Sequence, residues 1–318
     1  MKNRSILPIL LTTIFTSCSS NVNPIESKIF CFDTYVEVKL YQGDKGNLKD
    51  IEDIVNTYDR LTDNYKTRDV NNVYSINQTN EEVEIDEALF DLLDLSIRMS
   101  NFDGSYFNPL CGSLAKKWKD SLDKKEVLSQ EIIDEEVDKI VNTHLGFSSG
   151  DKVQRIGEAE IDLGGIAKGY TLDKVQDYLK SKQLTQYLIN GGSSSILLGE
   201  KTTKDGLFNV GLKDVHNAYL KLKNCFVSTS SISEQSAVID GVTYSHIINP
   251  HTGSAISVND AVIVVSNNGA LGDVLSTSMM MNTIDEIKTL ETKFDVQTIV
   301  VKNGNIIYQS ESLEVFYH

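Results

Sequence analysis

Residues 160–175 read EIDLGGIAKGYTLDKV, a glycine-paired loop that runs into a helix-like pattern. Gly164 and Gly165 lack a Cβ, so their backbone N–H groups can approach an anion closely. The helix that follows would add unpaired N–H donors and the positive end of its dipole, and Lys168 adds a cation. The spacing matches neither the GxGxxG dinucleotide turn nor the GK[ST] end of a P-loop. The stretch predicts a phosphate-binding turn, although an ordinary loop also accounts for these residues.

Helix and strand patterns surround this loop. Apolar residues recur at three- and four-residue steps in two segments, and a third segment is more acidic, which predicts helices at 46–64, 87–101 and near 130–143. Alternating or continuous apolar runs predict strands at 34–41, 187–190, 195–199, 261–266 and 297–301. Asn303-Gly304 predicts a hairpin after the last of these strands. Because there is no regular βα repeat, we expect an α+β fold, a mixed sheet core with flanking helices.

The N-terminal residues have the order of an export signal. Lys2 and Arg4 precede an apolar run at 6–15, and small residues then lead to Cys18. We expect a lipoprotein signal peptide at 1–17, a lipid on Cys18, a tether at 18–27 and a single domain at 28–318. A simple cleaved signal with a chance cysteine is the alternative. The expected location is an exported, membrane-anchored lipoprotein on the periplasmic or extracytoplasmic face.

The charge of the chain argues against nucleic acid as a partner. The formal net charge is −15, and removal of residues 1–17 takes away Lys2 and Arg4, so that −15 − 2 = −17. Phosphate backbones require clustered Lys and Arg, so a domain this acidic is expected to be a poor nucleic-acid binder. A bound dinucleotide must instead be held by local groups, such as a metal ion and backbone N–H donors. Cys31, Cys111 and Cys225 lack metal-like spacing and are expected to be buried or free thiols.

A candidate magnesium site lies near the C-terminus. Residues 270–281 look helical, and Asp273 and Thr277 are four residues apart, so both oxygens project from one helix face. Mg²⁺ takes hard oxygen ligands, often one or two carboxylates together with substrate phosphates. The alternative is an acid that stabilises the helix dipole beside a Ser/Thr-rich packing face.

Several blocks together resemble one known family. DLGGIAKGY, NGG, TS, HIINPHTG and DVLSTSMM follow the order and approximate spacing of the ApbE family, the FAD:protein FMN transferases, at 162–170, 190–192, 229–230, 246–253 and 273–280. The resemblance implies a T-fold-related architecture that holds the flavin between the core sheet and helical segments. It also implies that Mg²⁺ helps to split FAD, that FMN passes to a threonine hydroxyl of a target protein through a phosphodiester, and that AMP is released. The metal ligands would be Asp273, Thr277 and the backbone carbonyl of Ala167.

The resemblance also assigns the flavin site. The FAD-binding residues would be Tyr106, Phe107, Gly164, Gly165, Lys168, Asn190, Gly191, Gly192, Thr229, Ser230, His246, Pro250, Thr252 and Gly253. The chain departs from the family pattern at Asn108, Leu110, Ser231, Asn249 and His251.

Three residues are candidates for catalysis: His246, Asp162 and Lys168. His246 has a suitable pKa for proton transfer, although a turn residue bonded to backbone or flavin would look the same. Asp162 could accept a proton or cap the helix. Lys168 would stay near the phosphates.

Three functions fit these residues. The first is transfer of FMN to threonine-containing subunits of membrane redox complexes. The second is FAD hydrolysis to FMN and AMP by the same site, and the third is a flavin-binding lipoprotein without turnover. Asp273 and Thr277 favour catalysis, because a flavin store needs no metal on the pyrophosphate.

Overall fold

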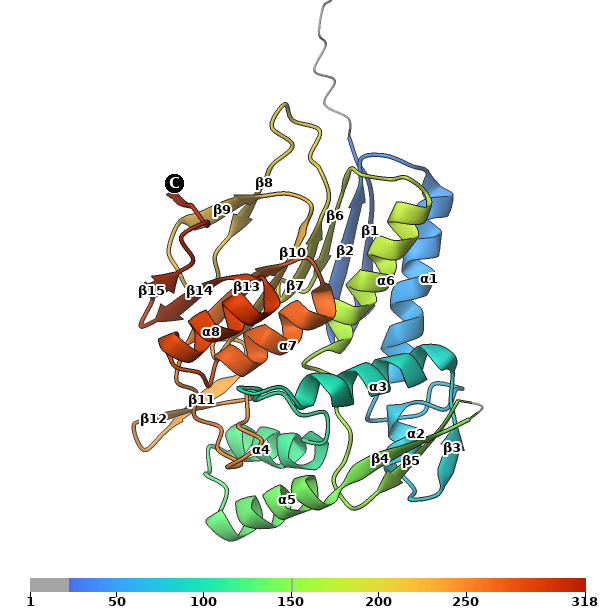
Figure 1. Cartoon of the computed structure of the whole chain (residues 1–318), viewed down its shortest axis with the longest axis vertical. Helices are drawn as coiled ribbons and strands as arrows, with labels where there is room; N and C mark the ends of the chain where they lie inside the picture. Colours follow the sequence, from blue (N-terminus) through green and yellow to red (C-terminus); the bar gives the residue numbers. More distant parts are fainter. Residues whose placement is uncertain (1–22, 150) are drawn as a thin grey trace, which may run out of the picture.

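The computed structural model describes residues 23–149 and 151–318. Its centre is a large sheet with the strand order β1-β2-β6-β7-β10-β13-β14-β15 (Figure 1). These strands are β1 (Ile25–Cys31), β2 (Thr34–Leu40), β6 (Tyr187–Gly191), β7 (Ser195–Leu198), β10 (Cys225–Ser231), β13 (Ala261–Ser266), β14 (Gln297–Lys302) and β15 (Asn305–Gln309). Each neighbouring pair is antiparallel.

The predicted α+β class is confirmed, but the sheet is antiparallel where we expected a mixed one. The connections explain this difference. Hairpins join β1 to β2, β6 to β7 and β14 to β15, and antiparallel strands are the ones that short turns can join. Between β13 and β14 the chain forms two helices, α7 (Gly269–Met279) and α8 (Ile284–Phe294). A single crossover helix would return the chain to the end of the sheet where β13 starts, and the next strand would be parallel. Two helices instead bring the chain back to the end where β13 finishes, so β14 runs antiparallel to it.

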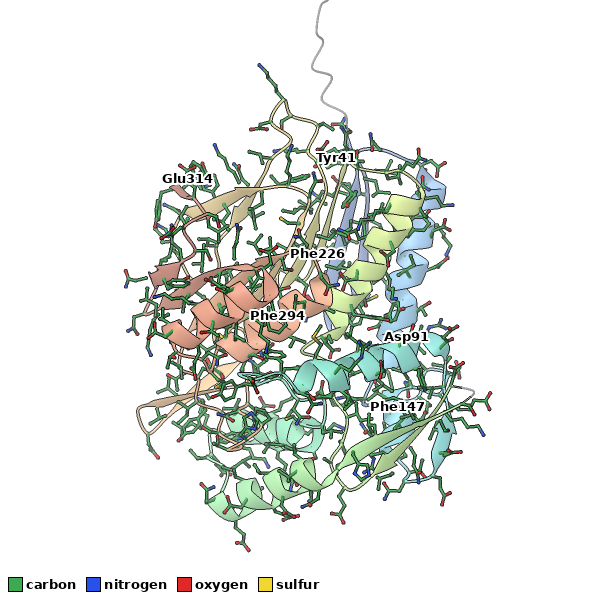
Figure 2. The ribbon with its side chains drawn as sticks, in the orientation of Figure 1. Tyr41, Asp91, Phe147, Phe226, Phe294 and Glu314 are labelled. Carbon is green, nitrogen blue, oxygen red and sulfur yellow. The ribbon has the colours of Figure 1, made fainter. Side chains whose placement is uncertain are left out.

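Helices cover one face of the sheet. Helix α1 (Lys45–Thr62) begins at a capping box on Asp44, and α6 (Ala167–Ser181) follows the glycine loop. Apolar side chains of both helices pack with strand residues in one cluster that includes Phe226 of β10 (Figure 2). This burial, at Leu172, Val175 and Leu179, holds the middle and the C-terminal half of α6 against the sheet.

The opposite face is covered by a small sheet of β8 (Phe208–Gly211), β9 (Ala218–Leu222) and β16 (Val315–Tyr317). Strand β13 is therefore buried on both sides. Val262 and Val264 pack with residues of α7 and α8, while Ile263 and Val265 pack with residues of β8 and β9. This explains why the sequence of β13 is continuously apolar rather than alternating.

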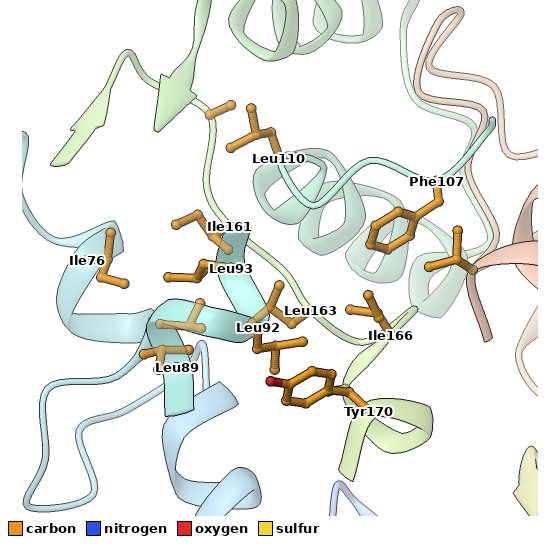
Figure 3. Packing of buried hydrophobic residues seen from close by; sticks show 14 of the residues in the cluster. Ile76, Leu89, Leu92, Leu93, Phe107, Leu110, Ile161, Leu163, Ile166 and Tyr170 are labelled. Carbon is orange, nitrogen blue, oxygen red and sulfur yellow. The ribbon is translucent and has the colours of Figure 1, made fainter. Parts of the chain in front are cut away.

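A helical lobe packs beside the sheet (Figure 1). It contains α2 (Val73–Asn77), α3 (Glu87–Ser100), α4 (Gly112–Lys124), α5 (Gln130–Asn142) and a sheet of β3 (Glu82–Glu84), β4 (His144–Ser148) and β5 (Lys152–Ile156). Ile161, Leu163 and Ile166 of the chain entering α6 lie in its apolar cluster with Leu89 and Leu92 of α3 (Figure 3).

Buried Asn77 fixes the chain that enters the glycine loop. Its Nδ2 donates to the Ile161 carbonyl at 2.9 Å, and its Oδ1 accepts from the Ile161 N–H at 2.7 Å. The lobe thus sets the position of the glycine loop.

The predicted elements are confirmed within a residue or two. The helices at 46–64, 87–101, 130–143 and 270–281 are α1, α3, α5 and α7. Asn303 and Gly304 both have positive φ, as a two-residue hairpin turn requires. The three cysteines of the described residues are free thiols, as expected.

Only part of the N-terminal prediction falls on residues that the structure describes. Residues 25–27, which we assigned to a tether, belong to β1, because alternate side chains of β1 are half-buried and its backbone pairs with β2. The signal peptide, Cys18 and the start of the tether lie outside the described residues. Across 23–149 and 151–318, no helix is both long enough and apolar enough to cross a membrane.

Candidate active site

A cleft of about 310 Å³ opens between the glycine loop, α7, the end of β10 and the helical lobe. Many of the predicted site residues line it together: Tyr106, Phe107, Asp162, Gly164, Gly165, Lys168, Thr229, Ser230, His246, Asp273 and Thr277. Segments that lie far apart in the sequence therefore contribute to one site. A volume of this size is at the lower end of ligand-binding pockets.

The start of α6 keeps backbone donors for an anion. The Gly164 N–H donates to Asp162 Oδ1 at 2.7 Å, and the Ala167 N–H donates to the Leu163 carbonyl at 2.8 Å. Among the described residues, the N–H groups of Gly165 and Lys168 have no hydrogen-bond acceptor. Both residues line the cleft. The predicted phosphate turn thus has two N–H groups and one ammonium group to offer.

Asp273 is the buried acid of the site. Its Oδ1 accepts from Ser195 Oγ at 2.8 Å and from Ser228 Oγ at 2.7 Å, and its Oδ2 accepts from the Gly169 N–H at 2.7 Å. Burial raises the pKa of Asp273, while Lys168 and the hydrogen bonds oppose that rise. A bound cation would favour the charged carboxylate and so offset the cost of its burial.

Helices α6 and α7 touch through bare backbone beside Asp273. A Cβ on Gly169 would lie 2.1 Å from the Gly269 carbonyl oxygen, and one on Gly269 would lie 2.3 Å from the Gly169 carbonyl oxygen. Glycine at both positions is what allows this approach. The contact brings the α6 N-terminus to Asp273.

The donor set of the cleft fits a hard dication. The described residues contain no group of three His, Cys, Asp or Glu side chains that could hold a metal. The cleft instead combines the Asp273 carboxylate with the hydroxyls of Ser195, Ser276 and Thr277. These are the oxygen ligands that Mg²⁺ takes when substrate phosphates complete its shell. The Ala167 carbonyl accepts from Thr171 Oγ1 at 2.7 Å, and Ala167 is not among the lining residues.

His246 has the hydrogen bonding of a neutral base. Its Nδ1 lies 3.1 Å from the Gln235 carbonyl oxygen, which can only accept, so Nδ1 carries the proton. Within the described residues Nε2 makes no hydrogen bond, and it is not among the buried unpaired atoms. Burial lowers the pKa of His246. The ring therefore presents an accessible Nε2 lone pair in a side chain that lines the cleft.

Asp162 is more constrained. Oδ1 accepts from Gly164 N–H, and Oδ2 accepts from Asn64 Nδ2 at 3.1 Å. The alternative of a helix cap is wrong, because α6 begins after Ile166 and has no side-chain cap. Asp162 closes an Asx turn within the loop instead.

The predicted aromatic pair, Tyr106 and Phe107, lines the cleft, but the two rings have different neighbours. Phe107 is 5% exposed, and its ring would lie 3.2 Å from a Cβ on Gly165, so it packs under the loop. Tyr106 meets the His251 ring edge-on with centroids 5.4 Å apart. His251 Nε2 donates to the Ser105 carbonyl at 3.1 Å, which supports this segment.

Other predicted residues lie outside the lining. Asn190 and Gly191 end β6 and Gly192 begins the β6–β7 turn, where Asn190 Oδ1 accepts from Ser193 N–H at 2.8 Å. That turn instead sends Ser194 and Ser195 into the cleft.

Pro250, Thr252 and Gly253 form a turn against the helical lobe. The Gly253 carbonyl accepts from Trp118 Nε1 at 2.8 Å. The roles of all these turn residues in flavin binding stay predictions.

Sequence reasoning missed several residues of the site. The hydroxyl partners of Asp273 are Ser195, which comes shortly after the NGG block, and Ser228, which comes directly before the TS block. The available signal was the run of polar residues that extends each block. Gln235 acts through its backbone carbonyl, which leaves no signal in the side-chain sequence. Tyr65, Lys116 and Lys119 also line the cleft, and both lysines lie over the Tyr65 ring.

The fold and the cleft define an α+β protein with an anion-binding turn facing a buried acid and several hydroxyls. The model of the ApbE family matches residues 32–300. The chain therefore belongs to the ApbE family and is an enzyme of that family.

Curated relatives named FAD:protein FMN transferase support this assignment. The Klebsiella pneumoniae protein is 29% identical over 86% of this chain and 88% of its own length. The Treponema pallidum protein is 29% identical over 62% of this chain, and the match spans 60% of that protein.

Solved structures share the fold. The ApbE protein from Thermotoga maritima aligns with a TM-score of 0.78 at 24% identity, covering 91% of this chain and 97% of that one. The flavin transferase ApbE from Vibrio cholerae aligns with a TM-score of 0.73 at 21% identity over the same shares of the two chains. At these identities the likeness concerns the fold alone.

Proposed function

We propose that this protein transfers FMN from FAD to a threonine hydroxyl of a target protein and releases AMP. The observation that carries the proposal is the meeting of the α6 turn, with two N–H groups and Lys168, and the Asp273 and Thr277 oxygens of α7 in one cleft. The name of the relatives, FAD:protein FMN transferase, supports the same reaction.

Each group of the site has a place in this chemistry. The N–H groups of Gly165 and Lys168 and the Lys168 ammonium would hold pyrophosphate oxygens. Asp273 and Thr277, with the predicted Ala167 carbonyl, would hold Mg²⁺, which when bound neutralises charge on those oxygens. Tyr106 would lie against the flavin ring, and Phe107, packed under the loop, would support that face of the site.

His246 is the better placed of the two candidate bases. Its neutral Nε2 can accept the proton of the threonine hydroxyl, whereas both Asp162 oxygens already accept hydrogen bonds. The threonine oxygen forms a bond to the phosphorus on the riboflavin side, and the bond from that phosphorus to the AMP oxygen breaks. AMP leaves with the electron pair of that bond.

The proposed partner is an exported or membrane-embedded redox subunit with an accessible threonine. An acyl chain on Cys18 would hold the enzyme at the membrane beside such subunits. The signal pattern of residues 1–18 supports this location.

The test is incubation with FAD, Mg²⁺ and a candidate acceptor, followed by intact-mass measurement. We expect the acceptor to gain one FMN less one water, with AMP appearing in equal amount. An acceptor with its threonine changed to alanine should gain nothing.

Release of FMN and AMP that no acceptor can divert would make the chain an FAD pyrophosphatase. Flavin binding without AMP release would indicate a flavin store. AMP release that is unchanged in excess chelator would contradict the magnesium site.

A further inference from the structure

The acid at position 173 has two backbone partners on another helix. Asp173 lies on the second turn of α6, and its Oδ1 accepts from the Gly269 N–H of α7 at 2.6 Å. Its Oδ2 accepts from the Ala270 N–H at 2.9 Å. No lysine or arginine within 23–149 and 151–318 forms an ion pair with Asp173. The carboxylate is thus held by the N-terminus of α7.

The arrangement is reciprocal. Asp173 of α6 binds the first N–H groups of α7, and Asp273 of α7 binds the Gly169 N–H in the first turn of α6. Between the two carboxylates the helices meet through the backbones of Gly169 and Gly269, with no side chain between them. Around this contact, Ala167 and Tyr170 of α6 share an apolar cluster with Ala270 and Val274 of α7, and such packing is non-directional. The two carboxylates add the directional links at this crossing.

We propose that Asp173 is a positioning residue that sets the place of Asp273 and Thr277 relative to the glycine loop and Lys168. Asp173 is not among the residues lining the cleft, so it acts through α7. This role rests on the proposed function, because it concerns the FAD-cleaving geometry. Burial raises the pKa of Asp173 to about 6, so the carboxylate is ionised in assays at pH 7.5.

The test compares full-length Asp173→Ala and Asp173→Asn with the control Asp177→Ala. Asp177 is an exposed acid one turn further along α6. Asparagine keeps one acceptor oxygen of the same length, and alanine keeps none. If the alanine variant does not fold, the asparagine variant supplies the comparison.

The first measurement is hydrogen–deuterium exchange of peptides that contain Gly169. Release of Asp273 from its place removes the acceptor of the Gly169 N–H, so exchange in Asp173→Ala should be about tenfold faster, as for loss of one hydrogen bond. Unchanged protection would overturn the proposal. Exchange needs no turnover, so it decides the role of Asp173 even if the wild-type protein releases no AMP and the proposed function fails.

The second measurement is the kinetics of AMP release. Loss of a residue that orients a metal-binding carboxylate reduces activity or metal affinity by about 10- to 100-fold. We expect Asp173→Ala to lower kcat and raise the Mg²⁺ concentration for half-maximal rate by that factor, while KM for FAD stays nearly constant. Asp173→Asn should be intermediate, and Asp177→Ala should match the wild type.

A purely stabilising cap would give another pattern. Asp173→Ala would then melt at a lower temperature but keep kcat and the Mg²⁺ requirement well below its Tm, and that result would contradict a positioning role. Equal kinetic losses in the asparagine and alanine variants would contradict it too.

Discussion

The N-termini of α6 and α7 meet beside the cleft, at Gly169 and Gly269, but differ in what their backbone donors do. At the start of α7 the first four N–H groups are all bonded: Gly269 and Ala270 to Asp173, and Leu271 and Gly272 to Asn268. At the start of α6, only the Gly169 N–H has a side-chain acceptor, Asp273. A saturated helix start can serve only as a support, whereas an open one can bind an anion. Phosphate should therefore bind at the start of α6 and not at the start of α7.

The largest loss of activity is expected at Asp273, the acid of α7 that accepts a hydrogen bond from the start of α6. Asp273→Ala removes the only carboxylate among the α7 residues lining the cleft. Loss of the charge stabilisation that a bound metal supplies is expected to lower AMP release by about 10³-fold, or several kcal/mol. Steady-state AMP release from FAD with Mg²⁺ measures the loss, and circular dichroism checks the fold. A folded variant that turns over at the wild-type rate would show that Asp273 serves only to join the helices.

A second prediction asks whether the α6 loop also supplies the base. His246→Gln should lower kcat by about 10²-fold, because general base catalysis contributes at least that much. Burial lowers the pKa of His246 from 6.5, so the neutral ring persists above that value and kcat should fall as pH drops below 6.5 through the folded pKa. His246 contributes stability above pH 6.5 that is lost over the same fall. The pH profile of kcat is the measurement.

Two variants control this prediction. His216 is exposed and away from the cleft, so His216→Gln should keep the wild-type profile. If Asp162→Asn, and not His246→Gln, removes the acid limb of the profile, the base belongs to the α6 loop.

The contact between the helices can be broken directly. Gly169→Ala would place a Cβ 2.1 Å from the Gly269 carbonyl oxygen and 2.8 Å from Asp273 Cγ. Overpacking of this kind typically lowers the free energy of unfolding by about 1–3 kcal/mol. Urea denaturation should show that loss, whereas Gly211→Ala, with no atom within 4 Å, should be neutral. Equal stability of the two variants would mean that the helices do not touch at Gly169.

Much of this comparison could be predicted from the sequence, but not all of it. The period of apolar residues located α1 and α3, and the Gly164-Gly165 pair located the open turn. The antiparallel order of the sheet depends in part on how α7 and α8 together return the chain from β13 to β14, which local patterns do not encode.

The hydrogen-bond partners of the site residues could not be predicted from the sequence either. Asp173 stood in the most informative stretch of the sequence, yet its role depends on α7 nearly a hundred positions later. Likewise, the backbone carbonyl of Gln235 orients His246. Because every residue carries such a carbonyl, the sequence does not reveal this contact.

Among the kinetic predictions, the smallest effect on kcat is expected at Lys168, the cation of the open turn. Lys168→Gln keeps most of the side-chain length but removes the charge. A hydrogen bond to a charged group contributes about 1.5–3 kcal/mol, so FAD affinity should fall by at least about tenfold. KM for FAD should rise accordingly, with a smaller change in kcat. Flavin fluorescence titration without metal measures the affinity directly.

The ligand series makes this prediction specific to the α6 N-terminus. Riboflavin has no phosphate, so the wild type and Lys168→Gln should bind it equally, whereas FMN and FAD should distinguish them. Lys180→Gln is the matched control, because Lys180 lies in the last turn of the same helix and donates to Gln176 Oε1 at 2.6 Å. A loss of riboflavin binding in Lys168→Gln would place the lysine against the ring rather than the phosphate. In that case the N–H groups of Gly165 and Lys168 alone would distinguish the open helix start from the closed one.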